Sequence, residues 1–214
     1  PLGIPGGADQ TYPFLSHSDY FYLTDRETAG GVLAFDPKDG WTDFVPDVTE
    51  AERVWEGRTD SPGTSLGQLA GWLAARRGRS LVMLGVPIPG VHADAVRSEE
   101  LREILLHVRR PKDATELARM KRAAAATALG FAAIEPLIRA GVSEREIQIE
   151  LEAAFARGGG DRTAYGTIVA AGGNSAVLHF TPTARRLREG EVLLIDAGCE
   201  VNRYAADVTR TWRS

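Results

Sequence analysis

Two neighbouring stretches decide the fold, Val192-Leu193-Leu194-Ile195-Asp196-Ala197-Gly198-Cys199 and Tyr204-Ala205-Ala206-Asp207-Val208-Thr209-Arg210-Thr211. Both are apolar runs next to turn residues, which predicts two strands over 192–197 and 204–212. If they pair as a hairpin about Val201-Asn202, Ile195 lies opposite Val208 and Asp196 opposite Asp207. Opposite residues in an antiparallel pair point to one side with Cβ atoms about 4.5–5.5 Å apart, where like charges repel. Two carboxylates in such positions need a reason.

A divalent cation is one such reason for the pair of aspartates. Carboxylate oxygens suit Mg²⁺, Mn²⁺ or Ca²⁺, and a carboxylate pair can bridge two ions about 3.5–4 Å apart. The alternative is that one aspartate caps a turn while the other is solvated. The spacing of Asp196 and Asp207 leaves both interpretations open.

His179 and Cys199 are the other residues to weigh. His179 lies among apolar residues between the turn at 172–174 and the next strand, where a histidine is either a structural or a functional residue. Cys199 has no histidine near it in sequence, so we interpret it as a small packing residue. The glycines at 158–160 and 172–173 match neither the dinucleotide fingerprint nor the Walker loop, which makes them turns.

Length, composition and charge limit the class of protein. The 214 residues allow one large domain or two small ones, and 43% hydrophobic with 25% charged residues is typical of a globular protein. The net charge of -4 gives no basic excess for nucleic acid or anionic lipid, so neither is an expected partner. No run of apolar residues is long enough to span a membrane. The single cysteine fits a reducing compartment, and we expect a cytoplasmic protein.

The first half of the sequence mixes strand and helix patterns up to a break near Pro111. Apolar runs predict strands over 20–23, 31–35 and 80–84, and turn residues occupy 36–40. Helical spacing predicts a helix over 65–77, and residues 96–107 form another helix or the entry to a strand. We expect an α/β unit and place the domain boundary after residue 110.

The second half begins with two helices whose starts are marked by capping boxes. Asp113 with Glu116, and Ser143 with Glu146, have the spacing in which side chains satisfy unpaired backbone N–H groups. The first helix runs from residue 114 and kinks or stops near Pro136; the second buries residues 147, 151 and 155 and stops at the glycines 158–160. A further strand is expected over 167–171.

Four motifs in this order resemble the Xaa-Pro aminopeptidases (aminopeptidase P), which share the pita-bread metallopeptidase fold with prolidase, methionine aminopeptidase and creatinase. The motifs are Ala164-Tyr165-Gly166-Thr167-Ile168-Val169, Val177-Leu178-His179-Phe180-Thr181, Leu194-Ile195-Asp196-Ala197-Gly198-Cys199-Glu200 and Tyr204 to Thr211. Residues 18–24 and 54–57 are similar to the family's N-terminal domain, and 109–116 to its interdomain junction. The resemblance implies an α/β (α+β) chain, with a creatinase/aminopeptidase P-type domain over 1–110 and the first half of a pita-bread domain over 111–214.

The resemblance also implies an activity. The family uses two metal ions, usually Mn²⁺, to remove the N-terminal residue from peptides whose second residue is proline, so such a peptide is the expected partner. Asp196 and Asp207 fall on metal ligands, and His179 on the histidine that contacts the substrate and stabilises the tetrahedral intermediate. Tyr165 falls among the substrate-binding residues.

The sequence departs from the family at its end. The family's other ligands, a histidine and two glutamates, one of them the expected general base, lie downstream of the segment that matches Asp207, and this sequence stops seven residues later. We therefore expect a truncated chain that is inactive in this form and holds Mn²⁺ weakly or not at all. Half a domain leaves apolar surface and the strand 204–212 uncovered, so a homo-oligomer is expected.

Two other functions remain open. A prolidase-like dipeptidase shares the motif pattern and differs mainly in preferring dipeptides, so cleavage of Xaa-Pro against Xaa-Pro-Yaa peptides separates the two. A non-catalytic peptide-binding or assembly module belongs to a different class. The presence of both Asp196 and Asp207 favours an enzyme site over such a module.

Overall fold

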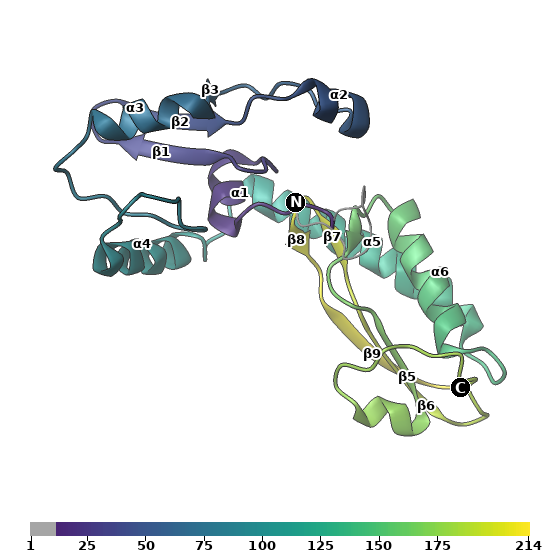
Figure 1. Ribbon diagram of the computed structural model, residues 1–214. Helices are drawn as coiled ribbons and strands as arrows, with labels where there is room; N and C mark the ends of the chain where they lie inside the picture. Colours follow the sequence, from purple (N-terminus) through teal and green to yellow (C-terminus); the bar gives the residue numbers. More distant parts are fainter. Residues whose placement is uncertain (1–11) are drawn as a thin grey trace. The chain divides into compact units, whose positions relative to one another are not determined.

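A computed structural model describes residues 12–214, and the chain divides into two units, Pro1–Arg110 and Pro111–Ser214 (Figure 1). The first unit is built from a small sheet and short helices. Its elements are α1 (Ser18–Thr24), β1 (Val32–Asp36), β2 (Gly40–Val45), α2 (Glu50–Glu56), β3 (Thr64–Ser65), η1 (Leu66–Gln68), α3 (Leu69–Ala74) and α4 (Ala95–Val108).

The sheet of the first unit has the order β1-β2-β3, with an antiparallel β1-β2 hairpin and a parallel β2-β3 pair. The hairpin turns where the sequence predicted, because the Asp36 carboxylate accepts the N–H of Lys38 at 2.9 Å and Gly40 adopts φ 78°. The helix predicted over 65–77 is present as η1 and α3, although it ends at Ala74. Residues 96–107 lie within the single helix α4.

Two predicted strands of this unit are wrong. Residues 20–23 belong to α1, where the hydroxyl of Thr24 donates to the carbonyl of Tyr20 at 2.7 Å. A run of four apolar residues is too short to show the periodicity that distinguishes a strand from a helix, which explains the error. Residues 80–84 form no strand, because the N–H of Met83 donates to the hydroxyl of Ser98 in α4 at 3.0 Å rather than to a neighbouring strand.

The second unit places two helices beside two three-stranded sheets. Its elements are α5 (Ala114–Ile134), η2 (Glu135–Leu137), α6 (Glu144–Arg157), β4 (Arg162–Thr163), β5 (Ile168–Ala171), η3 (Gly172–Ala176), β6 (Val192–Ala197), β7 (Cys199–Val201), β8 (Tyr204–Ala205) and β9 (Val208–Arg213). Both predicted capping boxes are confirmed at the starts of α5 and α6. Pro136 lies in η2, directly after the end of α5.

The core of this unit lies between the helices and one face of the sheet β5-β6-β9. Leu193, Ile195 and Ala197 of β6 are fully buried, while the residues between them point to the opposite face. The helix stripe of Ile147, Leu151 and Phe155 is buried in the same cluster, as the sequence predicted. The helices α5 and α6 therefore cover one face of the sheet (Figure 1). The alternating burial along β6 places Asp196 on the other face.

The register of the hairpin differs from the prediction by two residues. β6 pairs with β9 so that Asp196 lies opposite Thr209, and Val201 lies opposite Tyr204. The turn is therefore Asn202-Arg203, both with positive φ (46° and 67°), as a two-residue turn with the twist of a hairpin requires. The observed register differs from the predicted one by two residues, and side chains alternate between the faces of a strand. Asp196 and Asp207 therefore still lie on the same face of the hairpin.

The predicted strand over 204–212 is also interrupted, since Ala206 and Asp207 lie between β8 and β9. The chain here passes very close to the preceding strand. A Cβ atom at Gly198 would lie 1.7 Å from the carbonyl oxygen of Ala206, so only glycine permits the approach. Asp207 is thus presented from a break between strands rather than from within one.

Candidate metal and peptide site

Asp196 occupies the open face of the sheet near the end of β6. Its neighbours Ile195 and Ala197 point into the core, which places the Asp196 carboxylate on the face away from the helices. The hydroxyl of Thr209, directly opposite on β9, donates to Oδ2 of Asp196 at 2.8 Å. One oxygen of this carboxylate is therefore held in place by the neighbouring strand.

Tyr165, between β4 and β5, joins the two aspartates. Its hydroxyl oxygen lies 2.6 Å from Oδ1 of Asp196 and 2.8 Å from Oδ1 of Asp207. A hydroxyl carries one proton, so it donates to one of these carboxylates at a time. Burial, followed by the hydrogen bonds and negative charges of both aspartates, raises the pKa of Tyr165, which keeps the phenol protonated. The predicted proximity of Asp196 and Asp207 is present, although they do not face each other across the ladder.

The oxygen atoms of this cluster suit a hard divalent cation in kind but not in number. Asp196 and Asp207 offer carboxylate oxygens, the ligand type that Mg²⁺, Mn²⁺ and Ca²⁺ prefer. Such ions take six or more ligands, and no group of three or more His, Cys, Asp or Glu side chains able to hold a metal occurs within residues 12–214. The described residues therefore offer two ligands of a suitable type, fewer than such an ion requires.

His179 lies apart from this hydrogen-bonded cluster. It follows η3 in a loop whose residues Val177 and Leu178 are 53% and 87% exposed. The His179 side chain is also exposed and forms no hydrogen bond or ion pair with any residue that the structure describes. Of the four site residues predicted from the sequence, the structure brings together Tyr165, Asp196 and Asp207.

Thr209 is the residue of this cluster that the sequence analysis missed. It lies directly opposite Asp196 in the observed register of β6 and β9. The signal that identifies it is therefore this pairing, which requires the register of the hairpin. Cys199, in contrast, is the packing residue that we expected: it is fully buried, and its backbone N–H donates to the hydroxyl of Thr127 at 2.9 Å. Burial raises the pKa of its thiol, which disfavours a nucleophilic thiolate.

Sequence comparison gives relatives of one kind. Residues 118–214 match the model of metallopeptidase family M24. Xaa-Pro aminopeptidase 1 of Streptomyces coelicolor is 33% identical over 251 residues, covering 98% of this chain and 50% of the relative. The Xaa-Pro aminopeptidase of Escherichia coli is 27% identical, with 98% and 55% covered. This chain spans about half the length of the curated relatives that it matches.

Solved structures agree with the sequence relatives. Aminopeptidase PepP of Pseudomonas aeruginosa superposes with a TM-score of 0.75 at 26% identity, covering 94% of this chain and 53% of that chain. Proline aminopeptidase P II of Yersinia pestis gives a TM-score of 0.75 at 27% identity, with 100% and 57% covered. The predicted fold class, an aminopeptidase P-type mixture of helices and strands, is confirmed over this length.

Among the helices of residues 12–214, none has the length and apolar character needed to cross a bilayer.

Proposed function

Because residues 118–214 match the model of metallopeptidase family M24, we propose that this chain carries half of the catalytic site of a proline-specific aminopeptidase. The complete site removes the N-terminal residue from peptides whose second residue is proline. The observation that carries the proposal is the convergence of Asp196 and Asp207 on one hydroxyl at the open face of the sheet. Two acidic side chains held this close on the sheet face away from the helices would supply the start of a divalent-cation site.

Each residue of the cluster has a role in this proposal. Asp196 and Asp207 would contribute ligands to two divalent cations, with Mn²⁺ the expected ion, and Thr209 fixes the orientation of the Asp196 carboxylate through its hydrogen bond. The bound cations supply activation of water and positive charge against the developing oxyanion. His179 and Tyr165 contact the peptide, and the His179 imidazole donates a hydrogen bond to the oxygen that gains charge.

The proposal assigns no activity to the 214-residue chain alone. The remaining metal ligands and the general base belong to the half of the family's domain beyond the segment described here. Groups that act as a unit fail almost completely when part of the unit is absent. We place the protein in the cytoplasm, in line with its single cysteine.

Metal titration tests the half site directly. With only two carboxylates, we expect the isolated chain to bind Mn²⁺ with a dissociation constant on the order of 10⁻⁴ to 10⁻³ M, the weak end for carboxylate sites. Isothermal titration calorimetry measures this, and Asp196→Asn should remove the remaining heat. Submicromolar affinity at two sites per chain would show that the ligand set is complete without further residues.

Self-association is the second expected property of the isolated chain. β9 is an edge of the sheet β5-β6-β9, and within the described residues no strand pairs with its outer side. Unpaired N–H and C=O groups at such an edge favour pairing with another chain. We expect light scattering to show dimers or larger species at high concentration. Thr211→Lys, which adds a charge to the exposed edge, should shift the chain toward monomer; a wild-type chain that is strictly monomeric at high concentration contradicts this.

A further inference from the structure

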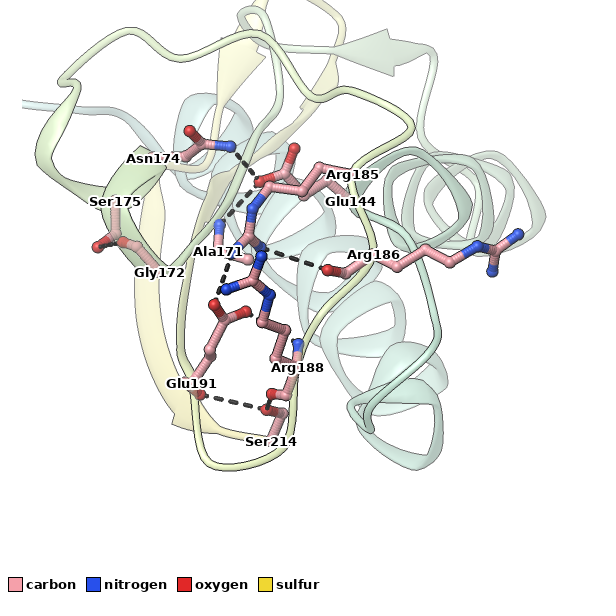
Figure 2. A network of polar contacts seen from close by, with 10 residues as sticks. All are labelled: Glu144, Ala171, Gly172, Asn174, Ser175, Arg185, Arg186, Arg188, Glu191 and Ser214. Carbon is pink, nitrogen blue, oxygen red and sulfur yellow. Dashed lines mark hydrogen bonds and ion pairs between the residues drawn. The ribbon is translucent and has the colours of Figure 1, made fainter.

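A buried carboxylate outside the metal cluster has no role in the site described so far. Glu144 is the first residue of α6 and is fully buried. Its Oε1 accepts the backbone N–H of Ala171 at 2.9 Å and the side-chain amide of Asn174 at 2.8 Å (Figure 2). Its Oε2 accepts the hydroxyl of Thr183 at 2.7 Å and the N–H of Thr183 at 3.2 Å. Four hydrogen bonds thus converge on the two oxygens of this one carboxylate.

The donors to Glu144 lie on both sides of the segment 175–182, which is called the loop below. Ala171 at the end of β5 and Asn174 in η3 precede it, and Thr183 follows it. The loop begins with the last two residues of η3 and includes His179. The first turn of α6 adds two more contacts at the second end, because the N–H groups of Glu144 and Arg145 donate to the carbonyls of Arg185 and Thr183. Both ends of the loop are therefore fastened to the start of one helix.

Within the loop itself, the hydrogen bonds are local. The hydroxyl of Ser175 donates to the carbonyl of Gly172 at 2.7 Å, and the N–H of Val177 donates to the carbonyl of Asn174 at 3.0 Å. Leu178 is exposed and contributes little packing. The position of the loop consequently depends on how its ends are held.

We propose that Glu144 is a positioning residue that fixes both ends of the loop 175–182 and thereby places the imidazole of His179. For the role of His179 the proposal rests on the function proposed above. Glu144 itself touches no substrate; it acts through the loop. The competing explanation is that Glu144 only stabilises the fold of the second unit.

Substitution by glutamine separates the two explanations. In Glu144→Gln the side chain keeps its shape, but one of its two oxygens becomes an NH₂ group that donates and cannot accept. The N–H of Ala171 is buried and must retain an acceptor, whereas Thr183 is exposed and its groups can turn to water. The end of the loop at Thr183 is therefore the end that should be released.

The test is ¹⁵N relaxation of the full 214-residue chain, without metal or peptide. We expect amide order parameters in residues 177–183 to fall from about 0.8 in the wild type to below about 0.6 in Glu144→Gln, while those in β6 stay near 0.85. The His179 imidazole signals should shift or broaden together with the loop. The matched control is Glu146→Gln, which removes the same charge from the same helix turn but loses the capping contacts with Ser143 and the exposed ion pair with Arg186 instead of the contacts with Asn174 and Thr183; its loop should remain ordered.

Two results overturn the proposal: a folded Glu144→Gln chain with unchanged loop order, or an equal loss of order in the loop and in β6. If Glu144→Gln does not fold, Thr183→Val removes the hydroxyl that donates to Glu144 and accepts the N–H of Arg185, and it should loosen the Thr183 end while η3 stays ordered. Unchanged loop order in Thr183→Val then overturns the proposal. The relaxation measurement involves no metal or peptide. A negative result therefore does not contradict the proposed function, and a chain without the proposed function could still show the loosened loop.

Discussion

A chain extended after Trp212 with the second half of Xaa-Pro aminopeptidase 1 from Streptomyces coelicolor is expected to release arginine from Arg-Pro-Pro in the presence of Mn²⁺. In that extended chain, Asp207→Asn should lower the rate by about 10³-fold or more, because an amide replaces a carboxylate ligand and the residues of such a site act as a unit. Release of free arginine measures the rate, and metal analysis of the purified chain measures the loss of the ligand.

The control for Asp207→Asn is Glu189→Gln in the same extended chain. Glu189 is exposed and takes no part in the hydrogen bonds of the cluster, so its neutralisation changes charge without removing a group of the site. We expect it to leave arginine release unchanged. If Asp207→Asn retained both its metal and its turnover, the assignment of Asp207 as a ligand would be wrong.

His179→Ala in the extended chain should separate substrate chemistry from metal binding. The imidazole is outside the hydrogen-bonded carboxylate cluster, so its removal should leave the metal content unchanged. Loss of one donor to a developing oxyanion costs about 10²–10³ in kcat. We expect a fall in kcat within this range, measured with Arg-Pro-Pro at saturating concentration.

Two outcomes contradict the role of His179. A variant that loses its metal would make this residue a ligand rather than a donor to the substrate. A variant with unchanged kcat would make it a residue of the exposed loop without a part in the reaction. Parallel assays with the dipeptide Arg-Pro test the prolidase alternative, which predicts faster release from the dipeptide.

The elements predicted best from the sequence are those whose ends are marked by capping side chains or turn residues. The capping boxes at Asp113 and Ser143 fix helix starts through side-chain hydrogen bonds within four residues, so they can be read without knowing the fold. The strand 192–197 is also local, since its flanking glycines and apolar run mark it. Residues 20–23 lack such markers, and their helix depends on its surroundings.

The register of the hairpin was missed because it depends on turn geometry. Choosing Val201-Asn202 as the turn ignores that a two-residue hairpin turn needs positive φ at both central residues, which Asn202 and Arg203 adopt. Because the register error was two residues, Asp196 and Asp207 were still predicted on the same face of the hairpin, and the acidic pair was found. Thr209, which faces Asp196, could not be found without the correct register.

Long-range contacts account for the rest of what the sequence did not reveal. Tyr165 is 31 residues before Asp196, and its hydroxyl bridges the aspartates only once β5, β6 and β9 have assembled. Nothing in the sequence distinguishes Glu144 from an ordinary acidic residue in the first turn of a helix. Its burial and its hold on Asn174 and Thr183 follow from the docking of a loop some 30 to 39 residues away.

The most direct test of the account is the activity of the unmodified 214-residue chain. Incubated with Mn²⁺ and Arg-Pro-Pro, the purified chain should release no arginine above a control that contains metal alone, because in the proposed function Asp196 and Asp207 are only half of the ligand set. Cleavage before proline that persists through purification and is lost in Asp196→Asn would contradict the account, since the site would then be complete within this chain.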